Sequence, residues 1–200
     1  MFIKITKEQI DEIFKNRNCK RWEKNIKTYI FLLDNIKNAH KKYILAEYQR
    51  NFNYFYQVRR NIKWRSEFYE LFFKYVKSNK SDFSDVLMAL YKRTGNVEAS
   101  FSSKFIATIN PKLPIIDRHV LSFLGEKLPS YKNDKDRIAQ IVKLYEKMNV
   151  EFADFLENTE EGKYLVKKFV SEYPDIKISK MKMLDFVLWQ SGGKHKLKNN

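Results

Sequence analysis

The sequence predicts an all-α fold, and three observations point to it. Glycine is nearly absent: the 200 residues include only five, and none precedes Gly95. Tight β-hairpin turns rely on glycine, so this scarcity argues against hairpins. Apolar residues recur at helical spacing along the chain, whereas no segment alternates convincingly as a strand would. The lack of glycine also excludes a P-loop and a dinucleotide-binding fingerprint, since both bring backbone close to phosphate through several glycines.

The helices can be placed in order from their apolar spacing and their caps. Thr6 is the expected cap of a short first helix that ends at Phe14. The spacing then predicts helices at 22–36, 43–56 (as one helix or two), 64–76, 82–93, 97–109, 117–124, 133–148, 152–157, 160–172 and 180–190. Ser81 is the expected N-cap of the helix that begins at residue 82 and Gly95 its C-cap, while Ser179 is expected to cap the last helix.

The composition is that of a folded protein from a reducing compartment. Hydrophobic residues make up 44% of the chain and aromatic residues 16%, so the core should be rich in rings. The single cysteine, Cys19, cannot form an internal disulfide. The first ten residues lack the apolar run of a signal peptide, and the apolar run Tyr29–Leu33 is too short to span a bilayer. We therefore expect a cytoplasmic protein with no membrane partner, associated with the nucleoid if it binds DNA.

The net charge of +15 is unevenly distributed along the chain. Residues 1–80 carry 19 Lys+Arg against 8 Asp+Glu, an excess of +11, whereas residues 81–150 carry +3 and residues 151–200 carry +1. A polyanion is the natural partner of such an excess, because each neutralised phosphate releases counterions. A genome that favours lysine codons would instead raise lysine everywhere. The concentration of charge in one part of the chain favours nucleic acid.

The sequence has no internal repeat and no long linker. We predict a basic N-terminal helical segment at 1–61 that packs on a helical core at 62–192, followed by a flexible basic tail at 193–200.

One segment, Thr94–Gly125, carries the strongest chemical pattern. Its first part is a helix rich in small residues, which permit close helix packing. An Asn-Pro turn and a second proline, Pro114, follow and favour an extended approach to the next helix. Asp117 stands at the start of that helix, directly after two apolar residues. A carboxylate in this position can cap the helix or project into a cleft.

This segment resembles the helix-hairpin-helix DNA glycosylase superfamily, and more closely a set of uncharacterised bacterial 8-oxoguanine-glycosylase-like proteins. The stretch IIDRHV (Ile115–Val120) is similar to the superfamily motif that carries the catalytic aspartate, and SSKF places Lys104 in the helix that holds a nucleophilic lysine in bifunctional members. MLDFVLWQSG (Met183–Gly192) resembles the terminal helix of the uncharacterised set. The resemblance covers roughly residues 80–192. It implies a helix-hairpin-helix glycosylase-like domain with an added basic N-terminal segment.

The segment also departs from the superfamily pattern. The superfamily hairpin has two glycines whose backbone N–H groups hold a DNA phosphate, whereas only Gly95 is present here. Glu98, which follows three residues later, would be unfavourable beside a phosphate. The interval of 13 residues between Lys104 and Asp117 is short for the superfamily. Since the chain has no cysteine cluster and only three histidines, no iron–sulfur cluster, other metal site or cofactor is expected.

The candidate catalytic residues each have a structural alternative. Asp117 is either the catalytic carboxylate that the resemblance implies or a helix cap. Lys104 is either a Schiff-base nucleophile, which must lose its proton, or one more surface lysine. Lys112, Arg118 and His119 flank the aspartate as candidate nucleic-acid contacts. As alternatives, the two cations are simply solvated and His119 packs or caps.

A second candidate surface combines cations with aromatic residues. Arg59, Arg60, Lys63 and Arg65 are interleaved with Tyr54, Phe55, Tyr56 and Trp64, a combination that suits phosphate contact with base stacking. An amphipathic helix with an aromatic core face explains the same pattern equally well.

Two functional hypotheses follow from the sequence. The first is a base-excision DNA glycosylase that flips a damaged base out of the duplex and releases it through Asp117, with water or Lys104 as nucleophile. The second is a module that keeps the glycosylase-like fold and binds DNA or RNA without chemistry. DNA is the expected partner in the first hypothesis and the favoured one overall.

Overall fold

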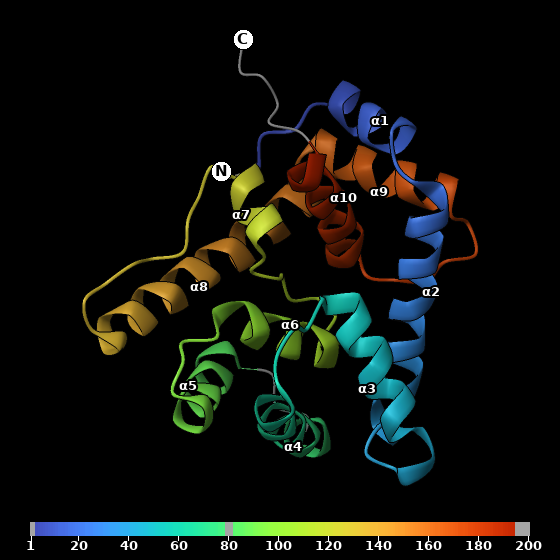
Figure 1. The fold of residues 1–200 in the computed structure, drawn as a ribbon. Helices are drawn as coiled ribbons and strands as arrows, with labels where there is room; N and C mark the ends of the chain where they lie inside the picture. The colour runs from blue at the N-terminus through green and yellow to red at the C-terminus, as the bar shows by residue number, and fades with distance from the viewer. Residues whose placement is uncertain (1–2, 79–81, 195–200) are drawn as a thin grey trace. The chain divides into compact units, whose positions relative to one another are not determined.

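The computed structural model of the protein describes residues 3–78 and 82–194, the last four by backbone alone. Every regular element in these ranges is a helix, so the all-α prediction is confirmed (Figure 1). The predicted cap Ser81 and residues 195–200 of the predicted tail lie outside the described residues. The helix predicted from residue 82 begins at Phe83, and its N-cap is Asp82 rather than Ser81, because the Oδ1 of Asp82 accepts the N–H of Asp85 at 2.9 Å. None of the helices described is long and apolar enough to cross a bilayer.

The chain forms two compact units, one from residues 1–17 and 111–200 and the other from residues 18–110. The boundary predicted between residues 61 and 62 falls inside the second of these. Residues 18–110 contain 18 Lys+Arg against 8 Asp+Glu, so this unit carries +10 of the net charge of +15. We refer to it below as the basic unit and to the other as the terminal unit.

The basic unit is built from consecutive helices around an aromatic core. Its helices are α2 (Cys19–Asn35), the short 3₁₀ helix η1 (Ile36–Asn38), α3 (Lys42–Tyr56), α4 (Ile62–Ser78), α5 (Phe83–Thr94) and α6 (Ala99–Ile109). The segment left open as one helix or two is the single helix α3. Ile44, Tyr48, Phe52 and Tyr56 are all buried on it, and their spacing of four residues keeps them on one face.

Ring contacts join α3, α4 and α6 inside the basic unit. The ring of Phe52 on α3 lies 5.5 Å from the rings of Phe68 and Phe72 on α4. Those two rings meet Phe105 of α6 edge to face, at 5.5 and 5.1 Å. Aromatic pairs at such distances add to the stabilisation from burial alone. They fix the position of α6, the helix that carries Lys104.

The terminal unit surrounds its last helix. It contains α1 (Lys7–Lys15), α7 (Arg118–Phe123), α8 (Asp134–Asn158), α9 (Glu160–Glu172) and α10 (Lys180–Lys194). Between residues 181 and 188 of α10 every side chain except Asp185 is buried, and α10 contacts each of the other four helices. A helix that is apolar on nearly all sides belongs in a core. Gly193 and Lys194, assigned to the tail from sequence, extend this helix.

The two helices predicted at 133–148 and 152–157 are in fact one, α8. The intervening residues, Asn149, Val150 and Glu151, include neither glycine nor proline, so nothing in the backbone ends the helix. The buried positions also continue across them at helical spacing, from Met148 to Phe152 and Phe155. Packing of this continuous face outweighs the weak helix propensity of asparagine and valine.

A close approach of backbones forms the corner between α8 and α9. Thr159 ends α8 and caps α9 by accepting a hydrogen bond from the N–H of Gly162 at 3.0 Å. A Cβ added at Gly162 would lie 2.0 Å from the carbonyl oxygen of Phe155. Only glycine therefore fits at this position.

A polar network holds α1 against α9. The hydroxyl of Tyr164 donates to Asp11 at 2.8 Å, and the ammonium of Lys168 lies 3.0 Å from the same carboxylate. The hydrogen bond from Tyr164, followed by that from Lys168, holds the pKa of Asp11 below its ordinary value. Arg17, after the end of α1, pairs with Glu172 at 2.7 Å.

Candidate nucleic-acid site

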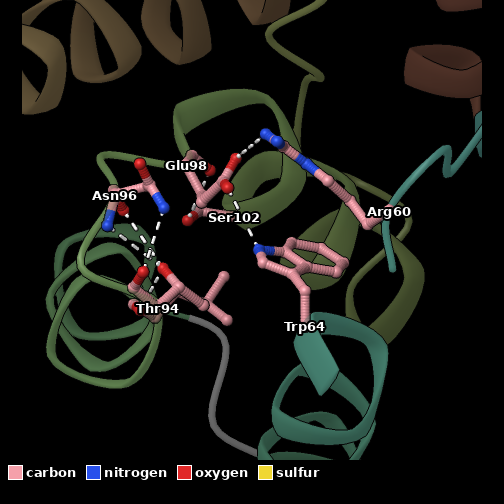
Figure 2. Close-up of polar contacts among 7 residues, drawn as sticks. Arg60, Trp64, Thr94, Asn96, Glu98 and Ser102 are labelled. Atoms are coloured by element: carbon pink, nitrogen blue, oxygen red, sulfur yellow. Dashed lines mark hydrogen bonds and ion pairs between the residues drawn. The ribbon is translucent and has the colours of Figure 1, made fainter. Parts of the chain in front are cut away.

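The turn between α5 and α6 is tight and held by its own side chains. Gly95 adopts a φ of +69° after α5, as expected of a C-cap glycine, and its N–H donates to the carbonyl of Tyr91 at 2.8 Å. The hydroxyl of Thr94 donates to the carbonyl of Leu90 at 2.8 Å. The side-chain amide of Asn96 donates to the carbonyl of Thr94 at 2.9 Å (Figure 2). The chain thus forms a helix–turn–helix with one glycine rather than two.

Glu98, the residue before α6, points into the protein rather than into solvent. Its side chain is 6% exposed and accepts hydrogen bonds from Nε1 of Trp64 at 3.0 Å and from Arg60 at 2.9 Å (Figure 2). Its backbone carbonyl accepts both the N–H and the hydroxyl of Ser102. The carboxylate expected to disfavour a phosphate at the hairpin is therefore buried and paired with a cation.

Sequence reasoning did not find this cluster of Arg60, Trp64 and Glu98. Glu98 lies 34 positions from Trp64 and 38 from Arg60, beyond the reach of any local pattern. One signal was present in the sequence: Glu98 stands between Val97 and Ala99, where a charged residue interrupts an apolar helix start. A buried carboxylate requires partners, and this interruption implies that partners exist elsewhere in the chain.

Arg60, a predicted nucleic-acid contact, is already engaged within the basic unit. Its guanidinium pairs with Glu98 and lies 5.5 Å from the ring of Trp64 and 5.3 Å from that of Phe101. The Arg60 side chain is 43% exposed, so part of it still reaches solvent. Its structural role in holding α4 to α6 comes in addition to any contact with phosphate.

The other predicted residues of this surface differ in their exposure. Arg59 and Lys63 are exposed and Arg65 is half-buried, whereas Tyr56 and Trp64 are buried. The hydroxyl of Tyr56 lies 2.9 Å from that of Thr108 inside the unit. Tyr56 and Trp64 therefore form part of the aromatic core, which was the alternative interpretation for them, while Tyr54 remains 45% exposed.

Lys104 is a buried lysine rather than a surface one. It is 9% exposed on α6, and its ammonium lies 5.5 Å from the centre of the Phe101 ring, one turn earlier. Ser102 and Ser103 beside it are also buried, and their hydroxyls donate to backbone carbonyls of the same helix or its cap. The small residues of α6 thus allow the helix to pack closely, as predicted from the sequence.

The connection that leads to Asp117 is anchored at two carbonyls. The hydroxyl of Tyr145 on α8 donates to the carbonyl of Pro114 at 3.0 Å, and the hydroxyl of Ser179 donates to that of Pro111 at 2.5 Å. Ile115 and Ile116 are both buried, as expected of apolar anchors. These contacts fix the path of the chain immediately before the aspartate.

Asp117 is half-buried and caps α7. Its backbone is extended, with φ −133° and ψ 150°, and its Oδ1 accepts the N–H of His119 at 2.9 Å. The ring of His119 packs edge to face on Trp189 of α10, with the ring centres 5.6 Å apart. Lys112 and Arg118, the two flanking cations, are exposed.

The two predicted catalytic residues belong to different compact units, Lys104 to the basic unit and Asp117 to the terminal unit. Across the described ranges, no three His, Cys, Asp or Glu side chains are grouped so that they could hold a metal ion.

Comparison of the chain with family models, curated proteins and solved structures found no match.

Proposed function

We propose that the protein binds DNA and acts as a base-excision glycosylase of the helix-hairpin-helix type. It would extrude a damaged base from the duplex and release it from its sugar. Asp117 would stabilise the positive charge that develops on the sugar as the base departs. The nucleophile would be water or the amine of Lys104.

The placement of Asp117 is the observation that carries this proposal. The carboxylate is half-buried at a helix start, and the connection before it is held by Tyr145, Ser179 and two buried isoleucines. A group that stabilises transition-state charge acts best when its position is set in advance.

The charge of the basic unit supports nucleic acid as the partner. Its eight acidic residues include three that pair with arginine inside the unit, since Glu98 pairs with Arg60, and Glu67 and Glu70 both pair with Arg93. Its lysines are mostly exposed. An excess of exposed cations raises the local concentration of a polyanion and accelerates its association.

A second candidate function is a nucleic-acid-binding module without base release. The α5–α6 turn has a single glycine, which favours this module. In the superfamily, the backbone N–H groups of two glycines hold a DNA phosphate, and this turn has only one of the two. The capping bond from Asp117 to His119 is also sufficient to explain an aspartate at that position.

One experiment separates these functions. The full chain is incubated with a panel of duplexes that each carry one lesion, and both binding and release of the free base are measured. Release from at least one duplex supports the glycosylase. Salt-sensitive binding without release from any duplex supports the module, and absence of binding at low salt contradicts both.

A further inference from the structure

Helix α2 presents a stripe of lysines to solvent. Lys20, Lys24 and Lys27 are all exposed, and their spacing of four and three residues places them on one face over about 10 Å of helix. The opposite face, which includes Trp22, Ile26 and Tyr29, is buried in the basic unit. These three lysines are not among the candidate nucleic-acid contacts predicted from the sequence.

An exposed tyrosine from the neighbouring helix lies beside this stripe. The ammonium of Lys24 lies 4.5 Å from the centre of the Tyr54 ring, which comes from α3 and is 45% exposed. Arg50 is exposed one turn earlier on the same face of α3. The adjacent residue Phe55 stacks on Tyr29 at 5.4 Å and so belongs to the apolar seam between α2 and α3, unlike Tyr54.

The surface keeps a net positive charge when its acidic neighbours are included. Glu23 lies at the edge of the stripe and Asp34 lies about two turns beyond Lys27, both of them exposed. Glu47 is also exposed, three residues before Arg50 on the same face of α3. The four cations of the surface still outnumber these three carboxylates.

We propose that Lys20, Lys24, Lys27, Arg50 and Tyr54, here called the α2–α3 surface, bind an unpaired stretch of a nucleic-acid strand. The four cations would contact successive phosphates and the Tyr54 ring would stack on a base, which is the combination that single-strand binding uses. On binding, Lys24 would exchange the tyrosine ring for a phosphate. This inference rests on the proposed function only in taking nucleic acid as the partner.

The exposed ring is the reason to expect unpaired bases rather than intact duplex. Cations alone would bind a single strand or a duplex, because both present phosphates. A stacked duplex offers base faces only at its ends, so a tyrosine on a basic surface gains little from it. Bases become available where a strand is open, as it is around an extruded nucleotide.

The test measures binding of the full chain to a labelled single strand and to the matching duplex by fluorescence anisotropy at fixed salt. The variant Lys20→Glu/Lys24→Glu/Lys27→Glu is compared with Lys143→Glu/Lys167→Glu/Lys177→Glu, which changes the net charge equally at three exposed lysines of the terminal unit. We expect the α2 variant to bind the single strand at least about tenfold more weakly than its control. The milder triple change to glutamine should give an intermediate loss.

A second pair of variants tests the stacking contact. Tyr54→Ala should weaken single-strand binding about tenfold and leave duplex binding unchanged. Its control, Tyr43→Ala, removes a tyrosine of the same helix that is 76% exposed and should change neither.

Each adverse result has a separate meaning. Equal losses in the two lysine variants would overturn the α2–α3 surface and leave the proposed function standing. Equal losses of single strand and duplex in Tyr54→Ala, or no loss at all, would overturn the preference for unpaired bases. Failure of the unmodified protein to bind either nucleic acid would overturn this inference together with the proposed function.

Discussion

The guanidinium of Arg60 donates a hydrogen bond to the buried carboxylate of Glu98 at 2.9 Å. The two residues come from opposite ends of the segment 60–98, and their contact joins the start of α4 to the start of α6. The same carboxylate accepts from Trp64 at 3.0 Å. This cluster makes the turn between α5 and α6 part of the folded core of the basic unit. Substitutions of Arg60, Trp64 or Glu98 should therefore lower the stability of the protein.

Replacement of Glu98 should destabilise the protein according to how many hydrogen bonds survive. Glu98→Ala leaves the buried N–H of Trp64 without its acceptor and should cost about 2–3 kcal/mol of the free energy of unfolding. Glu98→Gln keeps an acceptor for one donor and should cost about 1 kcal/mol. Urea unfolding followed by tryptophan fluorescence measures both.

A double-mutant cycle with Arg60→Ala provides the control for this pair. The losses from Glu98→Ala and Arg60→Ala should add up to more than the loss in the double variant, because the interaction can be removed only once. Strict additivity would show that the two residues do not interact in solution.

Substitution of Asp117 should separate catalysis from capping. Asp117→Asn should abolish base release from any duplex that the unmodified protein cleaves, while stability changes little because asparagine is an equally good N-cap. Asp117→Ala should lose base release and also about 1 kcal/mol of stability. Single-turnover release assays and thermal unfolding give the two readouts, and full activity in the asparagine variant would remove Asp117 from the chemistry.

Borohydride trapping tests whether Lys104 is the nucleophile. If it is, reduction in the presence of a cleaved lesion duplex should give a covalent adduct, which disappears in Lys104→Met, a variant of similar volume that preserves packing. Lys112→Met alters an exposed lysine and should retain the adduct. Efficient base release without an adduct would instead identify water as the nucleophile and leave Lys104 with a structural role.

The salt dependence of DNA binding should report on Arg59, Lys63 and Arg65. Changing all three to glutamine should weaken binding and flatten the plot of log K against log salt by about 0.9 for each phosphate that is no longer neutralised. Arg60 is excluded from this variant because its loss would disturb Glu98. The same change at Lys143, Lys167 and Lys177 serves as the control, and an equal flattening there would mean that phosphate binding is not localised to this surface.

The contact of Asp11 with Tyr164 and Lys168 should make stability depend on pH. These partners hold the pKa of Asp11 below its ordinary value, so its stabilising contribution is complete above that value and is lost as the pH falls through the lowered one. The urea midpoint of Asp11→Asn should therefore lie below that of the unmodified protein at about pH 6, and the gap should narrow at about pH 3. Asp175→Asn, at an exposed aspartate, should show no such gap at either pH.

Local pattern was sufficient for most of the helices. Thr6 caps α1, Gly95 closes α5 and Ser179 accepts the N–H of Lys182 at the start of α10, as the sequence predicted. Asp117 caps α7, which was one of the two roles left open for it. Caps and apolar spacing involve residues about four positions apart, so they can be recognised without knowing the tertiary structure. The error at α8 arose where residues of weak propensity interrupted a face that packing keeps continuous.

The sequence by itself therefore determined the fold class, most of the cap residues and the concentration of charge near the N-terminus. Only the tertiary structure decided which polar residues are buried: Glu98 with Arg60 and Trp64, Lys104 within α6, and Asp117 half-buried at its anchored helix start. It also decided that Trp64 belongs to the core while Tyr54 remains exposed beside Lys24. The physical reason is the sequence separation of the interacting residues. Burial of a polar side chain depends on partners tens of residues away and on the packing that brings them together.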